Sequence, residues 1–159
     1  MTTSRPAPPQ TADFPFRHRL RVRWSEVDPQ GIVFNPNYLV YADVGLTEFW
    51  RAAGVDYADL LETSGVDTFM VHCRADWFAS AHFDEEIEIG MRVERVGRTS
   101  LVFGFAVFGA GGAALASGAL TYVFARPGPP REPAPVPDEL VRDLKAFEDD
   151  LRAGRALCG

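Results

Sequence analysis

The sequence contains only two cysteines and three histidines, and neither set has the spacing of metal ligands. Cys73 and Cys158 are isolated from each other, which excludes a disulfide framework and fits a reducing cytosol. His18, His72 and His82 belong to different predicted elements. We therefore expect no bound metal ion, because a metal site needs several ligands from closely placed positions.

Other absences narrow the function further. No run of eighteen apolar residues is present, so no membrane span is expected. Residues 1–14 lack the apolar segment of a secretory signal, and we expect a cytoplasmic protein. The net charge of −6 argues against general binding to nucleic acid or anionic membranes. The chain also lacks a Gly-x-Ser-x-Gly elbow, a P-loop and a dinucleotide-binding fingerprint, so we expect no cofactor.

What remains is a chain typical of one globular domain. Its 159 residues are 47% hydrophobic, which is enough for a single sizeable core. Residues 1–14 contain three prolines and no periodicity, and are predicted to be a disordered tail. Residues 15–126 form the body of the domain. Residues 127–137 form a proline-rich connector, and residues 138–159 supply a last helix and a tail packed on the same domain.

The hydrophobic pattern predicts one long helix and five strands. The helix runs from Pro36 to about Ala53 and stops at Gly54. Alternation of apolar and polar residues predicts strands over residues 16–24, 69–79, 86–94, 101–108 and 115–125. Short glycine-rich connections between the last three favour antiparallel hairpins. This combination predicts an α+β fold in which a curved antiparallel sheet wraps around the helix.

Two surfaces of this sheet have a distinctive composition. The first strand alternates an apolar face with a face of four arginines, which we interpret as solvated charges that protect an edge strand. The outer face of the later strands is expected to expose apolar side chains, among them Val102, Phe108 and Tyr122. An exposed apolar face of this size predicts a homo-oligomer.

The segment from Asp28 to Tyr38 concentrates the groups that could perform chemistry. Asn35 is a good N-cap and Pro36 suits the first helical position, so a helix begins here with free backbone N–H groups. Gly31 permits a turn that places Asp28 beside this helix start. Asp-Pro-x-Gly is also a common plain turn, so the pattern alone leaves both interpretations open.

An aspartate beside a helix N-terminus is suited to acyl transfer. The N–H of Asn35 or Phe34 would stabilise an oxyanion, and Asp28 would act as general base to water or attack the acyl carbon itself. A thioester suits such a site because its thiolate leaves without acid catalysis. Asp43 lies beside the apolar face of the helix, where it either reaches water or contacts a bound ligand.

The run from Arg23 to Tyr38, with its Asp-Pro-Gln-Gly-Ile-Val segment, resembles the signature of hotdog-fold acyl-CoA thioesterases of the 4-hydroxybenzoyl-CoA thioesterase type. The similarity extends over roughly residues 15–150 and includes Asp43, residues 97–100, residues 122–125 and Val136-Pro137. It implies a hotdog fold, with a long central helix wrapped by a five-stranded antiparallel sheet. It also implies tetramers built from dimers, with active sites at the dimer interface.

The resemblance also implies roles for individual residues. Asp28 matches the catalytic carboxylate and the Asn35 amide the oxyanion donor, while Asp43 matches an acid that contacts a phenolic hydroxyl of the acyl group. Basic residues that meet the phosphates of coenzyme A, which is part of the substrate, match Arg98 and Arg126. The other positions expected at the substrate lie in the same matching segments: Gly31, Phe34, Tyr38 and Ser100.

Two departures from the family pattern leave the acyl group open. Glu26 stands where relatives often have aspartate, and Asn35 replaces both the histidine of a short-chain branch and the aromatic residue of the hydroxybenzoyl branch. A small, aromatic acyl-CoA is the first hypothesis. The alternatives are a short aliphatic acyl-CoA, an acyl-carrier protein, and an acyl-CoA-binding or regulatory protein without catalysis.

Overall fold

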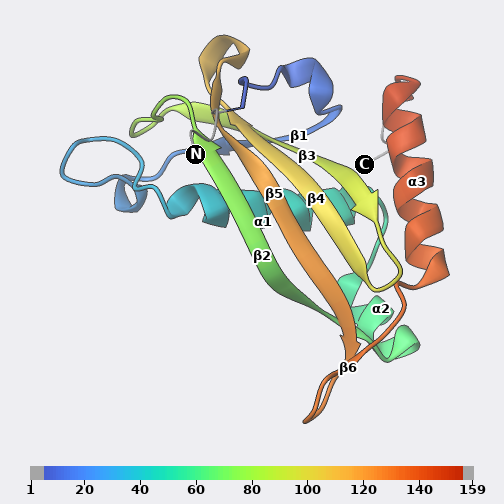
Figure 1. Ribbon diagram of the computed structural model, residues 1–159. Helices are drawn as coiled ribbons and strands as arrows, with labels where there is room; N and C mark the ends of the chain where they lie inside the picture. The colour runs from blue at the N-terminus through green and yellow to red at the C-terminus, as the bar shows by residue number, and fades with distance from the viewer. Residues whose placement is uncertain (1–5, 156–159) are drawn as a thin grey trace.

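The computed structural model describes residues 6–155 and confirms a curved antiparallel sheet wrapped around one long helix (Figure 1). Residues 1–5 and 156–159, and the parts of the expected tails that they form, lie outside the described residues. The elements in chain order are η1 (Thr11–Asp13), β1 (Phe16–Arg21), η2 (Trp24–Glu26), α1 (Asn37–Ala52), α2 (Tyr57–Ser64), β2 (Asp67–Trp77), β3 (Glu86–Val96), β4 (Ser100–Phe108), η3 (Ala110–Gly112), β5 (Ala114–Arg126), β6 (Glu132–Pro133) and α3 (Asp138–Arg152).

The main sheet has the strand order β1-β3-β4-β5-β2, and every neighbouring pair is antiparallel. The turn at residues 97–99 joins β3 to β4, and residues 109–113 join β4 to β5, which confirms the two predicted hairpins. β1 and β2 are the two edges of this sheet. Because β2 lies at an edge, one side of its backbone remains open among the described residues.

α1 packs on the sheet through one closely fitted face. The buried residues of this face are Tyr38, Tyr41, Ala42, Gly45, Leu46, Phe49 and Trp50. A Cβ atom on Gly45 would lie 2.4 Å from Cγ2 of Ile89 on β3, so glycine lets the helix approach the sheet closely. Phe49 contacts Phe16 of β1 and Phe103 of β4 with ring centroids 5.3 and 6.1 Å apart. The helix is therefore held against the half of the sheet that runs from the edge strand β1 to the central strand β4.

β1 is shorter than the sequence predicts. It ends at Arg21, and the expected last residue, Trp24, lies in the 3-10 helix η2 with 74% of its surface exposed. The backbone N–H of Arg23 donates to the side chain of Glu26, which closes η2 and turns the chain out of the sheet. The alternation of apolar residues continues through this turn, which is why the sequence pattern extends the strand too far.

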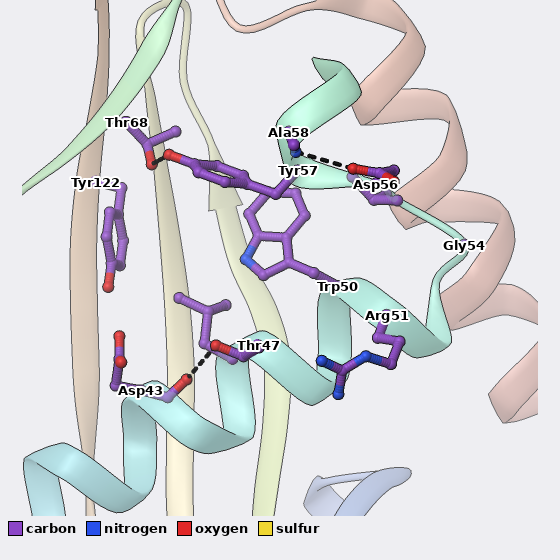
Figure 2. Close-up of a pocket in the computed structure, with 12 residues that line it drawn as sticks. Asp43, Thr47, Trp50, Arg51, Gly54, Asp56, Tyr57, Ala58, Thr68 and Tyr122 are labelled. Carbon is purple, nitrogen blue, oxygen red and sulfur yellow. Dashed lines mark hydrogen bonds between the residues drawn. The ribbon is translucent and has the colours of Figure 1, made fainter. Parts of the chain in front are cut away.

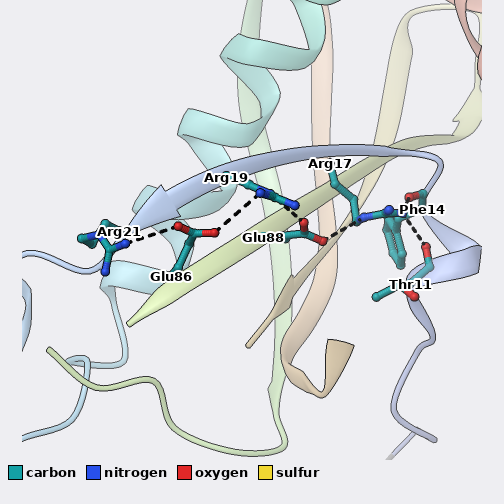
Figure 3. A network of polar contacts seen from close by, with 7 residues as sticks. All are labelled: Thr11, Phe14, Arg17, Arg19, Arg21, Glu86 and Glu88. Atoms are coloured by element: carbon teal, nitrogen blue, oxygen red, sulfur yellow. Dashed lines mark hydrogen bonds and ion pairs between the residues drawn. The ribbon is translucent and has the colours of Figure 1, made fainter. Parts of the chain in front are cut away.

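The arginines of β1 pair with glutamates of β3 (Figure 3). Glu88 accepts from both Arg17 and Arg19, at 3.0 and 3.1 Å, and Glu86 lies 3.3 Å from Arg21. These pairs are largely exposed, so each contributes little to stability. They confirm a charged face on an edge strand, with the charges neutralised by the neighbouring strand.

The outer face of the sheet differs from the predicted one at Phe108 and at Tyr122. The end of the expected tail packs on the sheet, because Thr11–Asp13 forms η1 and Phe14 is buried against Phe108 with ring centroids 5.9 Å apart, and the Arg92 guanidinium lies over the Phe14 ring. Phe108 is therefore covered by the chain itself. Tyr122 does not belong to this face either, because it contacts Phe103 on the side where α1 lies.

The proline-rich connector and the last helix close the domain. Residues 132–133 form β6, which pairs with the end of β5, so the connector folds back onto the sheet instead of remaining extended. α3 packs through Phe147, whose ring lies 5.2 Å from that of Phe49, and the carboxylate of Glu148 accepts from the Val93 N–H at 2.7 Å. In the part of the chain that the structure describes, no helix is both long and apolar enough to cross a membrane.

Candidate active site

A tight loop of residues 26–34, here called the Asp28 loop, leads directly into α1. The Asp28 N–H donates to the Ile32 carbonyl, and the Gly31 N–H returns to the Asp28 carbonyl, both at 2.9 Å. Gly31 has φ of +75°, as the turn requires. One carboxylate oxygen of Asp28 accepts from the Gln30 N–H at 2.8 Å, which leaves the other oxygen available. The loop thus holds the carboxylate in a defined place.

The helix start differs from the predicted cap in one respect. Pro36 is the N-cap residue and no side chain caps the helix, so Asn35 does not act as the cap. The Phe34 N–H donates to the Glu26 carbonyl at 2.9 Å and is not free. Among residues 6–155, the Asn35 N–H has no acceptor. Of the two amides that the sequence suggested as oxyanion donors, Asn35 is therefore the one available.

Glu26 is a residue of this region that sequence reasoning did not select. Only 6% of its surface is exposed, and its carboxylate accepts from the Tyr41 hydroxyl at 2.8 Å. Burial alone would raise the pKa of this carboxyl, but hydrogen bonds from Arg23 and Tyr41 outweigh burial and the pKa is lowered. In the sequence, Glu26 stands out only because relatives often have aspartate at its position, and this difference does not indicate that Glu26 bonds to Tyr41 and Arg23.

A cavity of about 810 Å³ opens beside the second half of α1 (Figure 2). We call it the α1 pocket. It is lined by Asp43, Leu46, Thr47, Trp50, Arg51, Gly54, Val55, Asp56, Tyr57, Ala58, Thr68 and Tyr122. Its volume falls in the range of small-molecule sites. Of the residues predicted from the sequence, only Asp43 lies in it.

The walls of the α1 pocket combine aromatic rings with a few polar groups. The Trp50 and Tyr57 rings lie 6.2 Å apart, and the Tyr57 hydroxyl lies 2.5 Å from the Thr68 hydroxyl. Figure 2 shows the Tyr122 hydroxyl and the Asp43 carboxylate pointing toward one another. Burial, with smaller effects of Asp43 and Tyr57, raises the pKa of Tyr122 to about 12. Tyr122 is therefore a neutral hydrogen-bond donor next to an acceptor.

The remaining predicted residues fall into two groups. Tyr38 is buried, its hydroxyl accepts from the Ala81 N–H at 3.0 Å, and its ring lies 6.5 Å from Trp77, so it has a structural contact of its own. Arg98, Ser100 and Arg126 lie at the far end of β3, β4 and β5, where the Ser100 carbonyl accepts from Gly97. Within the described chain, neither of these two arginines forms an ion pair.

The structure thus brings the predicted residues together in three places instead of one. Asp28, Gly31, Phe34 and Asn35 meet at the start of α1, Asp43 lies in the α1 pocket, and Arg98, Ser100 and Arg126 lie at the end of the sheet. The pocket residues that the sequence did not reveal come from four separate elements. Among the described residues, no three potential metal ligands cluster together.

Comparison with known proteins gives a consistent picture. Residues 30–116 match the family model of the thioesterase superfamily. The Bacillus subtilis protein YneP, which is named as a candidate acyl-CoA thioesterase, is 28% identical over 96 residues, covering 60% of this chain and 69% of that one. A Thermus thermophilus thioesterase solved with coenzyme A and zinc is 26% identical, with a TM-score of 0.71 over 86% of this chain and 96% of that one. A 1,4-dihydroxy-2-naphthoyl-CoA thioesterase from Synechocystis shares the fold, with a TM-score of 0.76 at 16% identity over 84% and 97% of the two chains.

Proposed function

The chain belongs to the thioesterase superfamily, and on that premise we propose that it hydrolyses an acyl-CoA at the Asp28 loop. The observation that carries this proposal is that, among residues 6–155, one Asp28 carboxylate oxygen and the Asn35 N–H both lack a hydrogen-bond partner at the same helix start. A carboxylate supplies the base or nucleophile, and a free amide supplies the oxyanion donor. The relatives described as thioesterases support the reaction class.

The proposed reaction needs few groups. With Asp28 as general base, water loses a proton to the carboxylate and attacks the acyl carbon, the C–S bond breaks, and coenzyme A leaves as a thiolate that then takes up the proton. With Asp28 as nucleophile, its carboxylate attacks the acyl carbon, the C–S bond breaks and coenzyme A leaves as a thiolate; water then hydrolyses the acyl anhydride to the free acid and the Asp28 carboxylate, and the proton released goes to the thiolate. In both routes the Asn35 N–H stabilises the oxyanion, which is commonly worth about 2.7 to 4 kcal/mol of barrier.

The α1 pocket supports an aromatic acyl group that has a hydroxyl. Trp50 and Tyr57 offer flat apolar walls. Asp43 accepts a hydrogen bond and Tyr122 donates one, and a hydroxyl is the group that can donate and accept at once. A short aliphatic acyl group would leave both unpaired. The guanidinium groups of Arg98 and Arg126, which form no ion pair within residues 6–155, are proposed to meet the phosphates of coenzyme A, with Ser100 beside them.

The separation of these groups suggests that two copies of the chain build each site. The Asp28 loop bonds to Ala81, just past the end of β2 at Trp77, and the α1 pocket includes Thr68 near the other end of the strand, about 30 Å from Trp77 along it. β2 has an open edge and exposes Met70 and Val71. We propose that two β2 strands pair antiparallel, placing Asp28 of one copy against the pocket of the other. Two such dimers would form the expected tetramer.

The first test is a substrate panel on the purified protein. Release of free thiol from 4-hydroxybenzoyl-, benzoyl- and short aliphatic acyl-CoAs is measured, together with binding of each. Asp28→Ala should reduce turnover by orders of magnitude while binding persists, because the carboxylate acts only in the reaction. Binding of acyl-CoA without thiol release from any substrate would favour the non-catalytic alternative, and hydrolysis limited to aliphatic substrates would remove the aromatic assignment.

A complementation experiment tests the shared site. Thr47 is exposed on the pocket wall, so Thr47→Trp should fill the α1 pocket without disturbing the core. Each of Asp28→Ala and Thr47→Trp should be inactive alone. In a coexpressed mixture, one site of each mixed dimer keeps an intact carboxylate and an intact pocket, so about a quarter of wild-type activity should return. No recovery in proven mixed dimers would place the whole site within one chain.

A further inference from the structure

We propose that Glu26 is a positioning residue that fixes the Asp28 loop to α1 through Tyr41. The inference rests on the proposed function, because it explains how Asp28 and the Asn35 amide keep their relative places. Glu26 does not contact the substrate in this proposal. It acts through the main chain of the loop and through the helix.

The surroundings of the Glu26 side chain are unusual for a carboxylate. In the described part of the chain, Glu26 and Glu148 are the two buried charged residues. One Glu26 oxygen accepts from the Tyr41 hydroxyl at 2.8 Å and from the Arg23 N–H at 2.7 Å. The other accepts from the Arg23 guanidinium at 2.7 Å. A buried carboxylate with this many donors is held in one orientation.

The main chain of Glu26 is tied to the helix as well. Its carbonyl accepts from the Phe34 N–H at 2.9 Å and from the Asn37 side-chain amide at 2.8 Å. Asn37 is the first residue of α1, and Tyr41 lies one turn later on its buried face. Glu26, the last residue of η2, therefore joins the start of the Asp28 loop to two successive turns of the helix. The proposed oxyanion donor Asn35 lies between Phe34 and Asn37, which both bond to the Glu26 carbonyl.

These hydrogen bonds fix the position of the Asp28 loop relative to the start of α1. Within the loop, Asp28 is held by its pairing with Ile32; Glu26 attaches the loop to α1, while Val33 and Ile32 attach its far side to Ala81 and His82. Loss of the Glu26 attachment would let the carboxylate move relative to the Asn35 N–H. A displacement of about 1 Å in such a site costs about 100-fold in rate.

Glu26→Gln tests the inference with little change in size. The amide replaces one acceptor oxygen with a donor that faces Arg23 or Tyr41, so the attachment weakens. We expect kcat to fall by about 100-fold while KM changes little. Tyr41→Phe removes one donor and leaves those of Arg23, so its loss should be smaller, about 10-fold. In the Asp28→Ala background, Glu26→Gln should add almost nothing, because the two residues act on one step.

Glu148→Gln is the matched control, because it neutralises the other buried carboxylate, which accepts from Val93 on the opposite side of the domain. It should lower stability and leave kcat unchanged. Hydrogen exchange supplies a readout that needs no activity: the Asp28, Gly31 and Phe34 amides should exchange faster in Glu26→Gln and not in Glu148→Gln.

The outcomes separate the two proposals. Faster exchange in the loop together with an inactive wild-type protein would support the attachment and reject the proposed function. An active wild-type protein whose kcat is unchanged by Glu26→Gln would overturn the positioning role. Unchanged exchange of the three loop amides in Glu26→Gln would overturn it too, whatever the activity.

Discussion

The facing pair of Asp43 and Tyr122 predicts how the protein discriminates between acyl groups. Tyr122→Phe removes the donor and Asp43→Asn removes the negative charge, and each change is nearly isosteric. Both residues line the α1 pocket, and Tyr122 is partly buried there. If a ring hydroxyl of the substrate lies between them, these substitutions should affect hydroxylated substrates and spare unsubstituted ones.

The size of the effect follows from the hydrogen bonds lost. A polar group left without its partner in a closed site costs about 1 to 3 kcal/mol, and each 1.36 kcal/mol is about tenfold in rate. Tyr122→Phe should therefore lower kcat/KM for 4-hydroxybenzoyl-CoA by about 5-fold to 150-fold. Asp43→Asn still accepts a hydrogen bond and Asp43 is exposed, so its effect should lie at the lower end of that range.

The assay compares kcat/KM for 4-hydroxybenzoyl-CoA and benzoyl-CoA in each single variant and in the double variant. Because the pKa of Tyr122 is raised to about 12, Tyr122 remains protonated and keeps its donor in neutral and mildly alkaline buffers. Because both residues contact the same hydroxyl, the two effects should not add. Equal losses on both substrates would refute the reasoning and make the pair structural.

Three further predictions concern stability, each measured by chemical denaturation. Gly45→Ala should lower the free energy of unfolding by about 1 to 3 kcal/mol, because its Cβ would lie 2.4 Å from Ile89, and an unchanged midpoint would mean that the helix is free to shift. Phe14→Ala should cost about 3 kcal/mol, because the ring is 2% exposed, whereas a loss near zero would indicate a detached segment. Folding lowers the pKa of Glu26 from 4.5, so the stability that its charged form contributes is present above pH 4.5 and is lost as pH falls through the folded pKa. Glu26→Gln should therefore make the free energy of unfolding less sensitive to acid. The same pH dependence in the variant and the wild type would contradict the lowered pKa.

Much of the fold could be predicted from the sequence because its signals are local. Alternation of period two identified the strands, the short glycine-rich connections identified the hairpins, and Gly54, with φ of +73°, marked the end of α1. Alternation became uninformative where both faces of a strand are apolar. This is why the pattern places Tyr122 on the outer face, although it lies in the wall of the α1 pocket.

The candidate site was predictable only in part, for a physical reason. The Asp28 loop is built from contacts within a few residues, so a short motif can reveal it. The bond between Glu26 and Tyr41 spans 15 residues. The α1 pocket gathers Trp50, Tyr57 and Thr68 from a helix, a second helix and a strand. Such groups meet only when the chain has folded, and no local pattern records their proximity.

The two edges of the sheet differ in a way that bears on how many chains can associate. At one edge, β1 presents arginines bound to Glu86 and Glu88, and past its end α3 supplies Glu148 to the next free amide of β3. At the other edge, β2 has no such cover among the described residues. Charged side chains on an edge strand oppose pairing with another chain, so the arginines of β1 disfavour extension of the sheet at that edge. In the proposed dimer, pairing through β2 would therefore not continue through β1, and the expected tetramer would form through the faces of the sheet.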